Sequence, residues 1–208
     1  MTFELILVDP WEPLCRAWRE FFADLPSVTI VQDVFQEVPE FHCMVSPANS
    51  FGLMDGGVDA AIIGYFGVQL MRDVQAHIIK DYFGEQPVGS SFIISTGHPK
   101  HPWLAHTPTM RVPMGITRTD NVYLAMWAML RAVHQHNERH EQLIGKVLCP
   151  GLGTGYGKVP PREAARQMAL AYRHYRHPPQ RIDWQFAEQR QSDVRYGGDM
   201  GFNIPPIG

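Results

Sequence analysis

Two glycine-bearing loops carry the residues whose types and spacing could do chemistry. The first reads SPANSFGLMDGG at residues 46–57 and leads to Asp59, and the second reads PGLGTGYGKVP at residues 150–160. Glycine leaves backbone N–H groups open to close approach, and such groups bind phosphate without any cation. Asn49 and Asp59 add an amide and a carboxylate to the first loop. The two loops therefore predict a site for a phosphate-bearing ligand, with polar side chains at one end.

The familiar phosphate motifs do not fit the second loop. In a Walker A motif Lys158 would be followed by Ser or Thr, but Val159 follows, and Leu152 stands where that motif needs its first glycine. The dinucleotide fingerprint fails because Tyr156 or Lys158 occupies its last glycine position. Glycines that serve tight turns alone remain the alternative for either loop.

The elements around the loops predict where the loops lie. Short apolar runs of strand-forming residues occupy 3–8, 28–31, 41–45, 91–95, 103–106 and 144–149. Helical spacing of apolar residues predicts helices at 13–25, 59–65, 67–83, 121–140, 161–175 and, more weakly, 183–190. Strands that alternate with helices predict an α/β protein with a largely parallel sheet, in which ligands bind at the carboxyl ends of strands. Both loops follow strands, so we expect strands 41–45 and 144–149 to be neighbours.

The motifs together resemble those of a known family, the macro domains, which bind ADP-ribose. The segments SPAN at 46–49 and GGVDAAI at 56–62 resemble the family signature N-A-A-N…G-G-V-D-x-A-I, with the spacing from Asn49 to Asp59 found in the macro-domain hydrolases. GTG at 153–155, with Pro160, is similar to the family's diphosphate loop, and LAHT at 104–107 to its I-H-T strand. The resemblance implies a three-layer α/β/α sandwich with a mixed, mostly parallel sheet over residues 1–180, and a C-terminal extension, 181–208, packed on it.

The resemblance also implies roles for individual residues. It implies that Asp59 carries out the hydrolytic step: the helix dipole would hold this carboxylate ionised, and the carboxylate would orient a water. It also implies that Asn49 hydrogen-bonds the hydroxyls of the distal ribose. Asp33 would accept a hydrogen bond from the adenine amino group. The ADP-ribose-binding residues implied are Asp33, Val34, Ala48, Gly56, Gly57, Val58, Gly153, Thr154, Gly155, Tyr156 and Gly157.

The sequence departs from the family pattern at several positions. Ser46 replaces the first Asn of the signature, and Asp55 interrupts the glycine run, where a carboxylate is unfavourable beside a diphosphate unless it points outward. Gly157 stands where an aromatic ring often stacks on the distal ribose, so either the distal pocket is more open here or Tyr156 forms its aromatic wall. Three functions remain open: hydrolysis of a mono-ADP-ribosyl ester, binding of ADP-ribose without turnover, and removal of phosphate from ADP-ribose 1″-phosphate.

The composition of the chain bears on its partners, its compartment and its need for metal ions. With a net charge of −3 and no basic run, the chain shows no nucleic-acid patch and no segment that could span a membrane. The cysteines at 15, 43 and 149 cannot all pair, which favours a reduced, cytoplasmic protein. The histidines of GHPKHPWLAH and HQHNERH are expected at the surface, since their spacing fits no metal site. We therefore expect neither a metal nor a cofactor, and a partner that is ADP-ribose or an ADP-ribosylated macromolecule.

Overall fold

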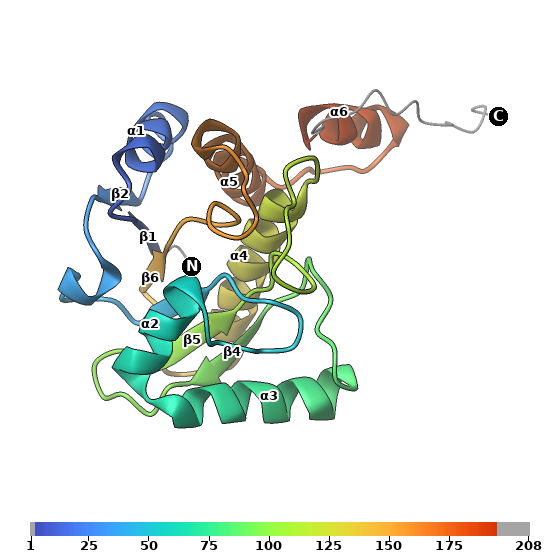
Figure 1. Cartoon of the computed structure of the whole chain (residues 1–208). Coiled ribbons are helices and arrows are strands. Elements are labelled where there is room, and N and C mark those ends of the chain that lie inside the picture. The colour runs from blue at the N-terminus through green and yellow to red at the C-terminus, as the bar shows by residue number, and fades with distance from the viewer. Residues whose placement is uncertain (1–2, 195–208) are drawn as a thin grey trace.

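The computed structural model describes residues 3–194, which build a single mixed sheet between two layers of helices (Figure 1). The strands are β1 (Glu4–Val8), β2 (Val28–Val31), β3 (Cys43–Ser46), β4 (Phe92–Ser95), β5 (Trp103–His106) and β6 (Lys146–Cys149). They lie in the order β2-β1-β6-β3-β5-β4. Every neighbouring pair is parallel except β4 and β5, which are antiparallel. The mixed, mostly parallel sheet predicted from the sequence is confirmed.

The helices cover both faces of the sheet. One face carries α1 (Glu12–Phe21), α4 (Asn121–Arg139) and α5 (Pro161–Arg176), and the other carries α2 (Gly57–Phe66) and α3 (Val68–Tyr82) (Figure 1). Strand β1 shows why both faces are apolar. Leu5 and Leu7 belong to the core under α1, α4 and α5, whereas Ile6 and Val8 belong to the core under α2 and α3. Because this strand is buried on both faces, its successive residues are apolar, which explains the continuous apolar run in the sequence.

The two strands that precede the glycine loops are neighbours, as predicted. Strands β3 and β6 run parallel, with Cys43 opposite Val147 and Met44 opposite Leu148. Their carboxyl ends therefore deliver the two loops to the same edge of the sheet, where α2 and α5 begin.

The expectation that the histidines lie at the surface is wrong for His101, His106 and His136, which are buried. His101 stacks on Phe41 with ring centroids 3.7 Å apart, and its Nδ1 lies 2.8 Å from the carbonyl oxygen of Phe41. His106 Nδ1 lies 2.5 Å from the side-chain oxygen of Gln86, and burial lowers the pKa of His106 to about 3. His106 is therefore a neutral part of the core, and His101 is packed within it. Within residues 3–194, no group of three His, Cys, Asp or Glu side chains could hold a metal ion.

The chain after α5 forms a further helix, α6 (Trp184–Val194), longer than the 183–190 segment expected. Arg166 of α5 donates to the carbonyl oxygen of Asp193 at 3.0 Å, and Arg190 donates to the Tyr123 hydroxyl at 3.1 Å. Residues 195–208 of the expected C-terminal extension lie outside the described residues. In the part of the chain described, no helix is both long enough and apolar enough to cross a membrane.

Candidate functional site

The first glycine loop is held in shape by Asn49. Its side-chain oxygen accepts hydrogen bonds from the backbone N–H groups of Phe51 (3.0 Å) and Leu53 (3.3 Å), and its amide nitrogen donates to the carbonyl oxygen of Leu53 at 2.7 Å. This is the turn-forming use of Asn that competes with ligand binding for the same atoms. Asn49 also lines the cavity described below, so one amide hydrogen is left to face a ligand.

The second glycine loop closes on itself. Val159 N–H donates to the Gly153 carbonyl oxygen at 3.1 Å, and Lys158 N–H donates to that of Gly155 at 3.2 Å. Gly153 adopts a left-handed conformation with φ of 71°. A Cβ there would lie 2.8 Å from the side chain of Val122, so the loop is packed tightly onto α4.

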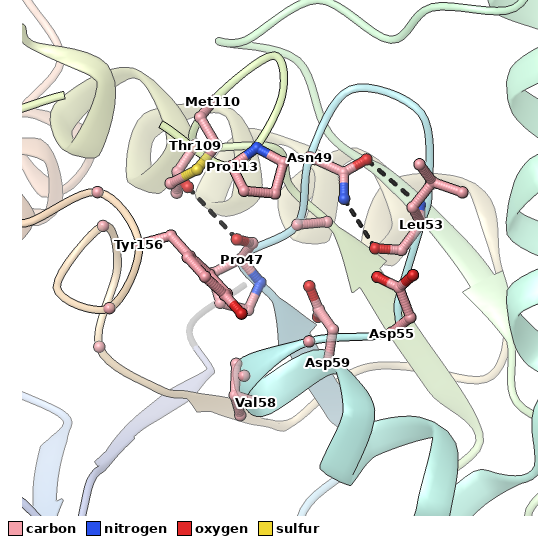
Figure 2. Close-up of a pocket in the computed structure, with 17 residues that line it drawn as sticks. Pro47, Asn49, Leu53, Asp55, Val58, Asp59, Thr109, Met110, Pro113 and Tyr156 are labelled. Carbon is pink, nitrogen blue, oxygen red and sulfur yellow. Dashed lines mark hydrogen bonds between the residues drawn. The ribbon is translucent and has the colours of Figure 1, made fainter. Parts of the chain in front are cut away.

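Between the two loops lies a cavity of about 330 Å³ (Figure 2). The predicted site residues that line it are Ala48, Asn49, Gly56, Gly57, Val58, Asp59, Gly153, Gly155, Tyr156 and Gly157. A second cavity, of about 430 Å³, shares Val58, Gly151 and Gly155 with the first. The remaining predicted residues, Asp33, Val34 and Thr154, line this second cavity. The structure thus brings all of them to two cavities that share lining residues.

Other lining residues were missed from the sequence. Asp9 and Trp11 line the second cavity, and Met110 and Pro113 line the first. Asp9 follows β1 directly, so its place at the carboxyl end of a strand was a usable signal. The segment with Met110 and Pro113 gave no such signal, because only the three-dimensional fold brings it over the first loop.

The N-terminus of α2 faces both cavities without a side-chain cap. Its N-cap is Gly56, and in the described chain no side chain caps this end. The first N–H groups of a helix have no partner within the helix, and the positive end of the helix dipole lies there. Gly57 has φ of 57°, a left-handed conformation that orients these groups and that glycine adopts readily. This end of α2 can therefore bind an anion through its backbone.

The ring of Tyr156 connects the two loops. Its side chain is 58% exposed and lies against Gly56, where a Cβ would come within 3.2 Å of the Tyr156 hydroxyl oxygen. Figure 2 shows this ring projecting from the second loop across the first cavity. Gly157 is buried in the loop beneath it, so Tyr156 is the aromatic wall of the first cavity.

Asp59 is a buried carboxyl at the floor of the first cavity. It is 7% exposed, and one of its oxygens accepts a hydrogen bond from the Ser46 hydroxyl at 2.7 Å. Burial raises the pKa of Asp59 to about 7; the hydrogen bond from Ser46 opposes the shift, and the charge of Asp55 adds to it. Desolvation thus raises the pKa of Asp59 although this carboxyl lies in the first turn of a helix, where the helix dipole favours the ionised form.

This buried carboxyl predicts a pH-dependent stability. The folded-state pKa of Asp59, about 7, lies above its ordinary value of 3.8, so between these values the folded chain keeps a proton that the unfolded chain has lost. The contribution of Asp59 to the free energy of unfolding should therefore fall as pH rises from about 4 to about 7, at up to about 1.4 kcal/mol per pH unit. Urea unfolding of the wild type and Asp59→Asn across this range measures it. A difference between the two proteins that stays constant with pH would contradict the shifted pKa.

Asp55 lines the cavity instead of pointing away from it. Figure 2 shows its carboxylate on the same side of the first loop as Asp59. Its side chain is exposed, so water screens its charge more than that of Asp59. The first cavity therefore holds two carboxyl groups in different environments.

Comparison with known proteins identifies the family. The family model of the Macro domain matches residues 45–168, and the chain belongs to this family. An uncharacterized protein of Aquifex aeolicus is 32% identical over 151 residues, which cover 72% of this chain and 82% of that protein.

Solved structures share the fold. A mutant of the Oceanobacillus iheyensis macrodomain with ADPR has a TM-score of 0.58 at 18% identity, covering 78% of this chain and 88% of that one. The macrodomain of Mycobacterium tuberculosis DarG has a TM-score of 0.56 at 17% identity, covering 68% of this chain and 86% of that one. Thermosipho africanus DarTG in complex with ADP-ribose has a TM-score of 0.52 at 13% identity, covering 69% of this chain and 36% of that one.

Proposed function

We propose that this chain binds ADP-ribose across the two joined cavities and hydrolyses a mono-ADP-ribosyl ester at the distal ribose. The observation that carries the proposal is the uncapped N-terminus of α2, which lies where the two cavities meet at Val58. A diphosphate at that point would accept hydrogen bonds from backbone N–H groups of both glycine loops. Adenosine would then fill the cavity that contains Asp33, and the distal ribose the cavity that contains Asn49 and Asp59. Two of the structural relatives were solved with ADP-ribose, which supports this ligand class.

Asp33 provides a test of the adenosine end. One of its carboxylate oxygens accepts the N–H of Val34 at 2.8 Å, which leaves the other free for an adenine amino group. A single hydrogen bond contributes about 0.5–1.5 kcal/mol, and more when its partner is left buried and unpaired. We therefore expect Asp33→Ala to weaken ADP-ribose binding about tenfold, measured by calorimetry. Unchanged affinity would remove Asp33 from the site.

Asp59 is the residue proposed to activate water. In hydrolysis of the ester, a water oxygen bonds to the anomeric carbon while the bond from that carbon to the carboxyl oxygen breaks, and the carboxylate leaves with the bonding electrons. The water loses a proton, and the unprotonated form of Asp59 can accept it. A base with a pKa of about 7 is well matched to work near neutral pH. The departing carboxylate is stable as an anion and needs no proton, so no separate acid is required.

Two other functions use the same cavities. A binding module would hold ADP-ribose without turnover, and a phosphatase would cleave ADP-ribose 1″-phosphate. We favour the hydrolase because Asp59 and the hydroxyl of Ser46 form a hydrogen-bonded pair at the floor of the cavity. We also propose that the protein works in the cytoplasm, since Cys15, Cys43 and Cys149 are free and buried.

A release assay tests the enzymatic part of the proposal. The substrate is a protein that carries mono-ADP-ribose on acidic side chains, and free ADP-ribose is measured after incubation. The hydrolase predicts release that saturates with substrate. Tight binding of ADP-ribose without release from any ADP-ribosylated substrate would instead identify a binding module.

A further inference from the structure

The ionisable side chains that line the two cavities have one sign of charge. They are the carboxyl groups of Asp9 and Asp33 in the second cavity and of Asp55 and Asp59 in the first. Among the residues that the structure describes, no Lys, Arg or His lines either cavity. Within the described residues, the cavity linings therefore offer the ligand only uncharged hydrogen-bond donors, and no cation is left to neutralise any further phosphate on the ligand.

We propose that Asp55 and Asp9 make the site select plain ADP-ribose and reject ligands with an additional phosphate on either ribose. Asp55 would exclude a phosphate on the anomeric carbon of the distal ribose, and Asp9 a phosphate on the 2′-oxygen of the adenosine ribose. This inference rests on the proposed function, because it uses the placement of ADP-ribose given there.

Asp55 acts at the distal end. Its carboxylate lies in the cavity with Asp59, and its charge is among the causes that raise the pKa of Asp59. A phosphate on the anomeric carbon would lie in this cavity beside both carboxyl groups. Like charges brought together in one site repel each other, which lowers the affinity for the ligand that carries the extra phosphate. The ester substrate has no charge at this position and avoids that cost.

Asp9 acts at the adenosine end, where its carboxylate is fixed. One oxygen accepts the N–H of Trp11 at 2.9 Å, and the other lies so close to Gly151 that a Cβ there would come within 2.9 Å of it. Asp9 thus lines the second cavity beside Gly151, which both cavities share, so in the proposed placement it lies near the ribose that joins adenine to the diphosphate. An acidic side chain accepts hydrogen bonds from ribose hydroxyls and repels a 2′-phosphate, as it does in dinucleotide-binding folds.

The nearest cationic residues in the sequence do not change this picture. Lys158 follows Gly157 but does not line the first cavity. Arg111 follows Met110, and its guanidinium is paired with Glu85 at 2.7 Å. The rejection of extra phosphate therefore depends on groups that the structure places inside the cavities.

Competition titration with three defined ligands tests the proposal. ADP-ribose, ADP-ribose 1″-phosphate and 2′-phospho-ADP-ribose are compared on the wild type, Asp55→Asn, Asp9→Asn and the control Asp24→Asn, an exposed carboxylate outside both cavities. We expect the wild type and the control to bind each phosphorylated ligand at least about tenfold more weakly than ADP-ribose. Asp55→Asn should reduce this difference in affinity only for ADP-ribose 1″-phosphate, and Asp9→Asn should reduce it only for 2′-phospho-ADP-ribose.

The outcomes separate this inference from the proposed function. If ADP-ribose itself does not bind the wild type, the proposed function fails. If ADP-ribose binds but all three ligands bind equally, only the present inference is overturned. Release of inorganic phosphate from the 1″-phosphate would overturn the present inference and would also favour the phosphatase over the proposed hydrolase. If Asp9→Asn folds poorly, the wild type alone still provides a test. Salt screens charge repulsion, so higher salt should bring the affinities for the two phosphorylated ligands closer to the affinity for ADP-ribose. Ratios that do not change with salt would contradict the proposal.

Discussion

Replacement of Asp59 by Asn is expected to lower the turnover of a mono-ADP-ribosylated substrate by about 10²–10⁴-fold, the usual contribution of a general base. The amide is nearly the same size as the carboxyl group and can still bond to the Ser46 hydroxyl, so the cavity should keep its shape. Affinity for ADP-ribose should change far less, because in the proposed complex the diphosphate is bound by the glycine loops and not by Asp59. Single-turnover release and calorimetry on the same protein separate the two effects.

The pH profile makes this test more specific. Turnover should rise with pH and level off above about 7, as Asp59 loses its proton. Ser46→Ala is the matched variant, because it keeps the carboxyl group but removes the hydrogen bond that lowers the pKa of Asp59. We expect the midpoint of its profile to move to higher pH while its maximal rate is largely kept. Full activity of Asp59→Asn at neutral pH would show that another group activates the water.

Gly57→Val should abolish measurable ADP-ribose binding, a loss of at least about 100-fold. Gly57 has φ of 57°, and a β-branched residue in this left-handed region is strained by about 1–2 kcal/mol. The chain can relieve that strain by moving the first turn of α2, which turns its N–H groups away from the diphosphate. Stability should fall only slightly, because a Cβ at Gly57 meets nothing closer than Tyr156 at 3.9 Å.

Gly64→Ala in the same helix is the control for this variant. A Cβ at Gly64 meets nothing within 4 Å, and Ala is the better helix former, so binding should be normal and stability equal or higher. Gly153 in the second loop is a poor site for the same substitution. A Cβ there collides with Val122, so a larger residue would disturb the core and not only the ligand site. Normal binding by Gly57→Val would show that α2 does not hold the diphosphate.

The sheet and the convergence of the two loops could be predicted because both depend on local patterns. Strands β3 and β6 are continuous apolar runs, and each leads through glycines into a helix, which places the loops together in a parallel sheet. The helix α6 was only partly predicted, since its contacts come through Arg166 and Tyr123 and not from an apolar stripe of its own.

The electrostatic state of the site could not be predicted in the same way. The position of Asp59 in the first turn of a helix favoured an ionised carboxylate, but its burial depends on how the first loop folds over it. Asn49 appeared free to bind a ribose, whereas most of its hydrogen-bonding capacity holds Phe51 and Leu53. Such contacts depend on the folded loop, which spacing along the chain does not describe.

Calorimetric titration of the wild-type protein with ADP-ribose, ADP and AMP tests the central claim, that the two cavities form one ADP-ribose site. We predict saturable binding of one ADP-ribose per chain, with affinity decreasing from ADP-ribose to ADP to AMP as the distal ribose and then one phosphate are removed. Absence of ADP-ribose binding, or equal affinity for all three ligands, would contradict it.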